Sequence, residues 1–182
     1  MQDHRFATLL LAVSLAGCGG GQARGPDGAT LERPAATASL VDSTGARAGV
    51  ATFADSGGSG RLAISVTGLE PGLHGMHLHE TGSCTKPDFQ SAGGHFNPGS
   101  RQHGSQNPEG MHAGDLPNLM VDEDGSADTS LAISSALLAP GPGSILGAEG
   151  RSLVIHADPD DEKTDPSGNS GARLICGVIE RR

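Results

Sequence analysis

Apolar and polar residues alternate with a period of two in several segments of this chain, which is the pattern of strands with one buried face. In residues 62–67, Leu, Ile and Val alternate with Ala, Ser and Thr, and similar alternation recurs in residues 131–133, 153–156 and 174–179. The intervals between these segments are rich in Gly, Pro, Asn and Asp, which favour turns. No long segment has helical periodicity. The pattern predicts an all-β fold, an antiparallel sandwich or barrel with Greek-key connections.

Two of the predicted connections are too long for tight turns. They cover residues 80–113 and 157–172, and long loops without secondary structure are usually either functional or disordered. The first connection carries His95 and His103, so we expect a bound metal ion to organise it.

The composition limits both the core and the partners of the chain. A length of 182 residues suits one domain with a short additional segment. Trp and Tyr are absent and only four Phe are present, so Val, Ile, Leu and Ala must form the core, which is adequate for a small sandwich. The net charge of −9 argues against nucleic acid, because phosphate binding requires clustered Lys and Arg. No stretch is long and apolar enough to span a bilayer.

The first 17 residues are interpreted as an export signal, with residues 6–16 as its apolar region. The following Leu-Ala-Gly-Cys sequence, residues 15–18, is typical of a lipoprotein processing site, which predicts cleavage before Cys18 and lipid attachment to it. The alternative is an ordinary signal peptide with an incidental cysteine. We expect an exported protein of the periplasm or cell envelope, attached to the membrane by its N-terminal lipid alone.

The remaining chain divides into a tether and a folded domain. Residues 18–36 are rich in Gly, Ala and Pro and are expected to form a flexible tether. The strand pattern and the histidines follow it, so residues 37–182 are expected to form the single folded domain.

Six of the eight histidines form one ordered series that ends in a strand. The series consists of His77, His79, His95, His103, His112 and His156, with Asp115 close to its fifth member. Imidazole is a favoured ligand of copper and zinc. Six histidines and one carboxylate exceed the needs of a single tetrahedral zinc ion, so the set predicts two metal ions.

The series resembles that of copper–zinc superoxide dismutases, and the resemblance runs from about residue 37 to residue 182. Further matching stretches are Gly-Leu-His-Gly at 72–75, Gly-Asp-Leu-Pro at 114–117, Asp-Glu-Asp-Gly at 122–125 and the tail 168–179. Residues 82–84 and 92–95 are similar to the bacterial branch. The resemblance implies an eight-stranded, immunoglobulin-like Greek-key barrel. It also implies conversion of superoxide to dioxygen and hydrogen peroxide through Cu(II)/Cu(I) cycling.

The resemblance implies a ligand set for one copper and one zinc ion per subunit. The copper ligands are expected to be His77, His79, His95 and His156, and the zinc ligands His95, His103, His112 and Asp115. Four nitrogens in a flattened arrangement suit Cu(II), and three nitrogens with one oxygen suit a closed structural zinc site. The shared residue, His95, would bridge the two ions through its two ring nitrogens and exchange a proton during turnover.

Two further residues match functional positions of the family. Arg173 corresponds to the arginine that attracts and orients superoxide beside copper; the alternative is a surface arginine on the last strand. Asp160 corresponds to an acid that links a copper histidine to a zinc histidine. Because Asp160 lies within an acidic run, a solvated loop residue is a serious alternative.

The three cysteines are an odd count. If Cys18 carries lipid, Cys84 and Cys176 remain, and an oxidising compartment favours a disulfide between them. Two separate thiols are the alternative for a cytosolic protein.

Two other functions remain open at this point. One is a non-catalytic copper- or zinc-binding protein for storage or delivery, and the other is a copper-only relative, although the zinc ligands are intact here. The oligomeric state is also open, with a homodimer as one option.

Overall fold

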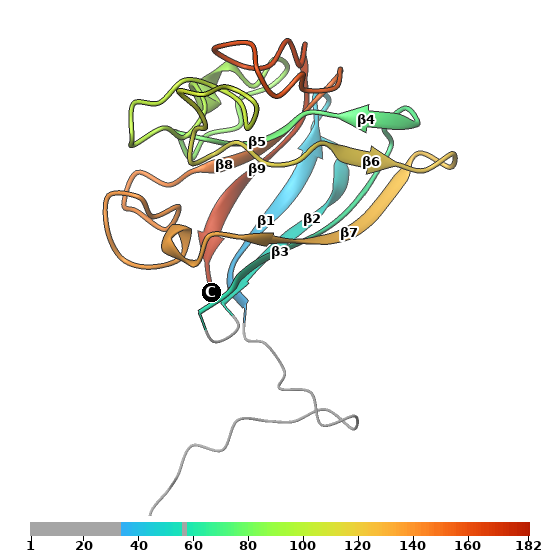
Figure 1. The fold of residues 1–182 in the computed structure, drawn as a ribbon. Helices are drawn as coiled ribbons and strands as arrows, with labels where there is room; N and C mark the ends of the chain where they lie inside the picture. The colour runs from blue at the N-terminus through green and yellow to red at the C-terminus, as the bar shows by residue number, and fades with distance from the viewer. Residues whose placement is uncertain (1–33, 56–57) are drawn as a thin grey trace, which may run out of the picture. The chain divides into compact units, whose positions relative to one another are not determined.

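The computed structural model describes residues 34–55 and 58–182 (Figure 1). The predicted signal peptide, Cys18 and most of the predicted tether lie outside the described residues. Strand β1 begins at Pro34, within the last residues assigned to the tether. In the described part of the chain, no helix is long and apolar enough to cross a membrane.

The described residues form nine strands and two short 3-10 helices. The strands are β1 (Pro34–Asp42), β2 (Arg47–Asp55), β3 (Gly60–Thr67), β4 (Gly72–His74), β5 (Met76–His79), β6 (Leu119–Val121), β7 (Ser126–Ile133), β8 (Ser152–His156) and β9 (Arg173–Arg181). The 3-10 helices are η1 (Gln90–Ala92) and η2 (Ser135–Leu137). This confirms the prediction of an all-β fold.

All strand pairs are antiparallel, and they form one large curled sheet and one small one (Figure 1). The large sheet has the order β5-β8-β9-β1-β2-β3-β7, and the small sheet pairs β4 with β6. Strands β4 and β5 follow each other directly, interrupted at Gly75, whose amide and carbonyl bond instead to Asp158 and His156. Counted as one strand, they give the eight strands that the family resemblance implies.

The alternation seen in the sequence sorts residues between the core and the solvent. On β3, Leu62, Ile64 and Val66 are at most 2% exposed, and they join Phe53 and Leu153 in the main hydrophobic cluster. Strands with large β-branched or aliphatic side chains on one face bury that face against the opposite side of the curled sheet. The nearly aromatic-free core therefore consists mainly of Leu, Ile, Val and Ala, as predicted.

A second, smaller cluster lies on the other side of β8 and β9. It contains Phe89, Ala92, Val154 and Cys176, with Cys84 packed against it. Cys84 and Cys176 form a disulfide with 5.7 Å between their Cα atoms, which confirms the predicted pair. This cluster fixes the start of the 80–118 connection against the large sheet, so the loop that carries His95 is attached to a rigid surface.

Both long connections predicted from the sequence are present. Residues 157–172 contain no strand, and residues 80–118 contain only η1 and isolated bridges. These two connections gather at the same end of the molecule in Figure 1. A third long connection, residues 134–151, was not predicted. Within it, the fully buried Ile145 packs in the core and donates its amide to the Leu137 carbonyl at 2.8 Å.

Candidate metal centre

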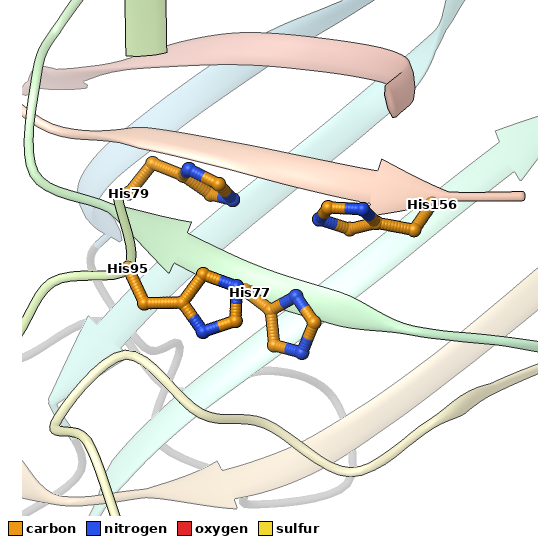
Figure 2. A group of neighbouring side chains, drawn as sticks. All are labelled: His77, His79, His95 and His156. Atoms are coloured by element: carbon orange, nitrogen blue, oxygen red, sulfur yellow. The ribbon is translucent and has the colours of Figure 1, made fainter. Parts of the chain in front are cut away.

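Four histidine rings from three segments converge on one buried point (Figure 2). His77 and His79 extend from β5, His156 ends β8, and His95 comes from the long connection beside them. A spacing of two on a strand places the first pair on one face. Pairing of β5 with β8 brings His156 close, and an isolated bridge between residues 79 and 95 places His95. Each of the four offers a nitrogen within 4.8 Å of the others.

One nitrogen of each of these rings is buried and has no hydrogen-bond partner. These atoms are His77 Nδ1, His79 Nε2, His95 Nε2 and His156 Nε2. A buried polar atom without a partner is costly, and four of them facing one another fit a metal ion that accepts their lone pairs. They match the four predicted copper ligands.

The other ring nitrogens explain why these particular atoms are free. His79 Nδ1 lies 3.1 Å from the Gly93 carbonyl, and His156 Nδ1 lies 3.3 Å from the Gly171 carbonyl. His77 Nε2 lies 2.7 Å from Asp160 Oδ2. An acceptor at one nitrogen holds the proton there and leaves the opposite nitrogen with its lone pair. The surroundings therefore select the metal-binding tautomer of these three rings.

A second group of donors adjoins the first through His95. Asp115 Oδ1 lies 3.0 Å from His95 Nδ1, 3.0 Å from His103 Nδ1 and 3.1 Å from His112 Nδ1. The other carboxylate oxygen, Oδ2, accepts the backbone N–H groups of Gly104 and His112, each at 2.9 Å. Three nitrogens and one oxygen in a closed, buried arrangement fit a structural zinc ion.

Two histidines compete for the fourth place in this group. His77 lies near enough to His95, His103 and Asp115 to be counted with them. However, its Nε2 is already bonded to Asp160 and its Nδ1 belongs to the four-histidine group. His112 has its Nδ1 only 3.4 Å from His95 Nδ1 and 3.1 Å from Asp115, so His112 is the better zinc donor.

Asp160 links the two groups. Its Oδ2 lies 2.7 Å from His77 Nε2 and its Oδ1 lies 3.0 Å from His103 Nε2. The side chain is 2% exposed, so the solvated-loop alternative does not describe it. Gly168 passes directly over this link at φ 62°, and a Cβ there would lie 2.7 Å from His103 Nε2 and closer still to Asp160. Glycine is required at this position by both the backbone angle and the space.

The electrostatic surroundings differ between the two groups. Burial, with the neighbouring His95 ring, lowers the pKa of His79 to about 2, and burial with the His77 ring lowers the pKa of His156 to about 3. Burial also lowers the pKa of His95 to about 4. Burial would lower the pKa of His103 as well, but Asp115 and Asp160 raise it to about 9. His79, His95 and His156 are thus neutral at pH 7, as copper ligation requires.

The two carboxylates in the centre stay ionised. Burial alone would raise the pKa of Asp115, but its bonds to His103, His95 and two backbone N–H groups hold that pKa well below the ordinary range. The pKa of Asp160 is also lowered, because its bonds to His103 and His77 outweigh burial. Two fixed anions beside the histidines suit the binding of divalent cations.

A cavity of about 610 Å³ opens onto the rings of His95 and His156. Arg173 lines it, and its guanidinium is fixed by two backbone carbonyls, Nη1 to Phe89 at 2.8 Å and Nη2 to Gly93 at 2.7 Å. A cation held by neutral acceptors keeps its charge available for an anion in the cavity.

Three charged residues of this cavity, Glu80, Arg101 and Asp165, were given no role from the sequence. Arg101 and Asp165 both line it, although the first was unassigned and the second was counted only within an acidic run. Only the arrangement of the two long connections brings them together. By contrast, His74, which lies outside the histidine series, has both ring nitrogens at backbone carbonyls: its Nδ1 and Nε2 face the carbonyls of His156 and Glu70 at 2.7 and 2.9 Å.

The sequence model of copper/zinc superoxide dismutase matches residues 47–179 of this chain. The chain belongs to the copper/zinc superoxide dismutase family. Copper and zinc are the metals of this family, and the two donor groups described above fit them. The family resemblance read from the histidine series is therefore confirmed, whereas the assignment of each ligand remains a prediction.

Relatives in this family align with nearly the whole chain. A copper–zinc superoxide dismutase of Deinococcus radiodurans is 42% identical over 187 residues, covering 94% of this chain and 93% of that protein. The superoxide dismutase-like protein YojM of Bacillus subtilis is 40% identical over 188 residues, covering 97% and 96%. A crystal structure of a superoxide dismutase-like protein from Bacillus subtilis has a TM-score of 0.75 and 41% identity, over 78% of this chain and 96% of that chain.

Proposed function

We propose that this protein converts superoxide to dioxygen and hydrogen peroxide at a paired copper and zinc centre. The observation that carries the proposal is the set of four buried, unpartnered histidine nitrogens at the end of a cavity lined by Arg173. One of these histidines, His95, has its second nitrogen in the adjoining Asp115 group. This pairing suits a redox metal beside a structural one.

Bound copper would supply the one-electron chemistry, taking an electron from one superoxide ion and returning it to a second. His77, His79, His95 and His156 would hold it in a buried site, because all four are at most 8% exposed. His95 would hold and deliver a proton at Nε2, the nitrogen that lies in the four-histidine group. Asp115, His103 and His112 would hold zinc and keep the His95 ring in place through Nδ1.

The cavity residues would select a small anion. Arg173, which lines the same cavity as His95 and His156, would attract superoxide and orient it toward their rings. Arg101 adds a second cation to the same wall. Their attraction acts at short range, where solvent screening is weakest.

The decisive experiment measures metal content and superoxide removal on the same sample. The purified protein is loaded with copper and zinc, assayed for both metals, and then mixed with superoxide in a stopped-flow instrument. We expect about one ion of each metal per chain and fast removal, with zinc-only protein as the inactive control. Stoichiometric metals without removal above that control would contradict the proposal.

A non-catalytic copper- and zinc-binding role is the second candidate. The relative YojM, aligned over nearly its full length, is named only as superoxide dismutase-like. Such a protein would bind both metals at the same groups and release copper readily to a partner. The experiment above separates the two roles, since this role predicts metal binding without turnover.

We further propose that the protein is exported and attached to a membrane through lipid on Cys18. The support is the sequence Leu-Ala-Gly-Cys at residues 15–18 and the Cys84–Cys176 disulfide, which is typical of an oxidising compartment. Replacing Cys18 with Ser should release the protein from membranes and abolish labelling by a fatty acid. The Cys84→Ser variant, which keeps Cys18, is the control; membrane-bound and unlabelled Cys18→Ser protein would contradict the anchor.

A further inference from the structure

Asp165 contacts two of the proposed zinc ligands from the opposite long connection. Its Oδ1 accepts the backbone N–H of His103 at 2.7 Å and lies 3.9 Å from His112 Nε2. No part of the sequence pattern distinguishes this residue from the other acids around it. The contacts explain how an acid that is half exposed, at 50%, is directed toward the metal centre.

The bond to the His103 backbone has a specific consequence for that ligand. His103 is fully buried, and it lies in a segment without strand pairing beyond an isolated bridge between Gln102 and Gly110. Asp160 holds the ring through Nε2, and Asp165 holds the main chain. Because His103 is held at its ring and at its main chain, its Nδ1 points toward Asp115. A charged acceptor makes a stronger bond than a neutral one, so loss of Asp165 would free the main chain at this ligand.

Besides Asp165, Asp160 and Glu162 of the 157–172 connection also bond to the first connection: Asp160 bonds the His103 ring and Asn118, and Glu162 bonds residues 105 and 106. Glu162 accepts the Gln106 backbone N–H at 2.9 Å and the Ser105 hydroxyl at 2.6 Å. Both donors follow His103 in sequence and are not proposed metal ligands. Asp165 itself is presented by a turn that Asp161 organises through the Thr164 N–H and hydroxyl. The turn thus places one carboxylate oxygen where it accepts the main-chain N–H of His103, a proposed zinc ligand.

We propose that Asp165 is a positioning residue that holds His103 and His112 in the geometry required for zinc. The inference rests on the proposed zinc site. Asp165 also lines the cavity through which an anion must pass, where a negative charge opposes superoxide. Its place there is explained by the zinc ligands that it holds rather than by the substrate.

The test compares zinc retention in Asp165→Ala, Asp165→Asn and Asp165→Gln. Zinc release to a chromogenic chelator is followed at pH 7, and Co(II) is substituted at the zinc site so that its visible absorption reports ligand geometry. Asp165→Ala should lower zinc affinity by roughly 10–100-fold, as loss of a residue supporting metal ligands usually does, and alter the cobalt spectrum. Asp165→Asn keeps an oxygen at the same place and should retain zinc.

The Gln variant and a charge control make the result specific. Asp165→Gln displaces the acceptor oxygen by one methylene and should lose zinc as the Ala variant does, so the Asn–Gln pair decides the matter if the Ala variant does not fold. Asp158→Ala removes an exposed charge from the same connection and should behave as wild type. Equal zinc retention in Asp165→Ala and Asp158→Ala, or equal zinc loss in the Asp165→Asn and Asp165→Gln variants, would overturn the proposed role of Asp165 but not the zinc site. A wild-type protein that binds no zinc would instead overturn the zinc site itself.

Discussion

His79 and Arg173 share one acceptor, the backbone carbonyl of Gly93, at 3.1 and 2.7 Å. One is a proposed copper ligand and the other is the cation proposed to guide the substrate. The same peptide therefore fixes both the metal-binding tautomer of the ring and the position of the guanidinium. Its own position depends on the short η1 segment and on the small cluster that contains the Cys84–Cys176 disulfide. The disulfide thus lies at the base of the whole arrangement.

Replacing Cys84 or Cys176 with Ser should lower the free energy of unfolding by roughly 2–5 kcal/mol, the usual effect of losing a native disulfide. The bond closes a separation of 92 residues, so the unfolded chain gains considerable freedom without it. Urea unfolding of the metal-free protein, followed by far-UV circular dichroism, measures the change. Wild type treated with a reductant is the matched control and should unfold with the variant; an unchanged midpoint on reduction would contradict the role of the bond.

Those features of the fold and the site that depend on local strand geometry could be predicted from the sequence. Alternation in residues 62–67 gave the buried face of β3, and the two-residue spacing of His77 and His79 placed both on one face of a strand. It could not show that Val154 packs in a separate cluster from Leu153, because alternation assigns faces but not what covers each face.

The residues that were missed lie in the long connections. Arg101 and Asp165 are separated by more than sixty positions, and both lie in segments rich in polar and turn-forming residues. Only the folding of the two connections over the same end of the sheet brings their side chains to one cavity. Asp160 was assigned through the family resemblance, since nothing in its own acidic run distinguishes it. Contacts between irregular segments are set by tertiary packing, which leaves no periodic signal in the sequence.

Replacing His95 with Ala should leave copper with three histidine ligands and remove the connection to the zinc group. Superoxide removal should fall steeply and zinc should bind less tightly, because His95 Nδ1 also contacts Asp115 and His112. Electron paramagnetic resonance of protein with copper in both sites reports the shared ligand directly. Strong magnetic coupling is expected in wild type and should vanish in the variant; two uncoupled copper signals in wild type would contradict a bridging His95.

The metal-free protein should lose stability as the pH falls from 6.5 toward 4.5. His79, His95 and His156 have ordinary pKa values of 6.5 that the folded protein lowers to about 2, 4 and 3. Below pH 6.5 the unfolded chain therefore binds protons that the folded chain does not, and unfolding becomes more favourable. His103, with its pKa raised to about 9, has the opposite sign: its contribution is complete below pH 6.5 and is lost as the pH rises through 9.

Thermal unfolding across this pH range measures the effect. The His156→Gln variant removes one of the three titrating rings and should show a shallower decline than wild type. Bound copper and zinc should also make the decline of wild type shallower. This protection should end at the pH at which protons displace the metals. A metal-free wild type whose melting temperature is constant between pH 6.5 and 4.5 would show that the rings are not held neutral.

The two cavity arginines and the net charge of the protein together set how the rate depends on salt. With a net charge of −9, the distant field of the protein repels superoxide, and attraction comes from Arg173 and Arg101 at short range. Screening acts mainly beyond roughly 8–10 Å at ordinary ionic strength. The second-order rate constant of wild type should therefore fall only gently with added salt, or rise at low salt as the repulsion is screened.

Substitutions separate the contributions of the individual cations. Arg173→Glu should lower the rate constant strongly at every ionic strength, since it reverses the charge beside the rings of His95 and His156. Arg101→Ala should lower it moderately, because this side chain is exposed on the cavity wall. Lys163→Ala is the matched control, because it removes an exposed cation that does not line the cavity, and it should have the smallest effect. The measurement is the rate constant of all four proteins across one salt series, with metal content equalised. A steep fall with salt in wild type, or equal effects of Arg101→Ala and Lys163→Ala, would show that the guiding charge lies outside this cavity.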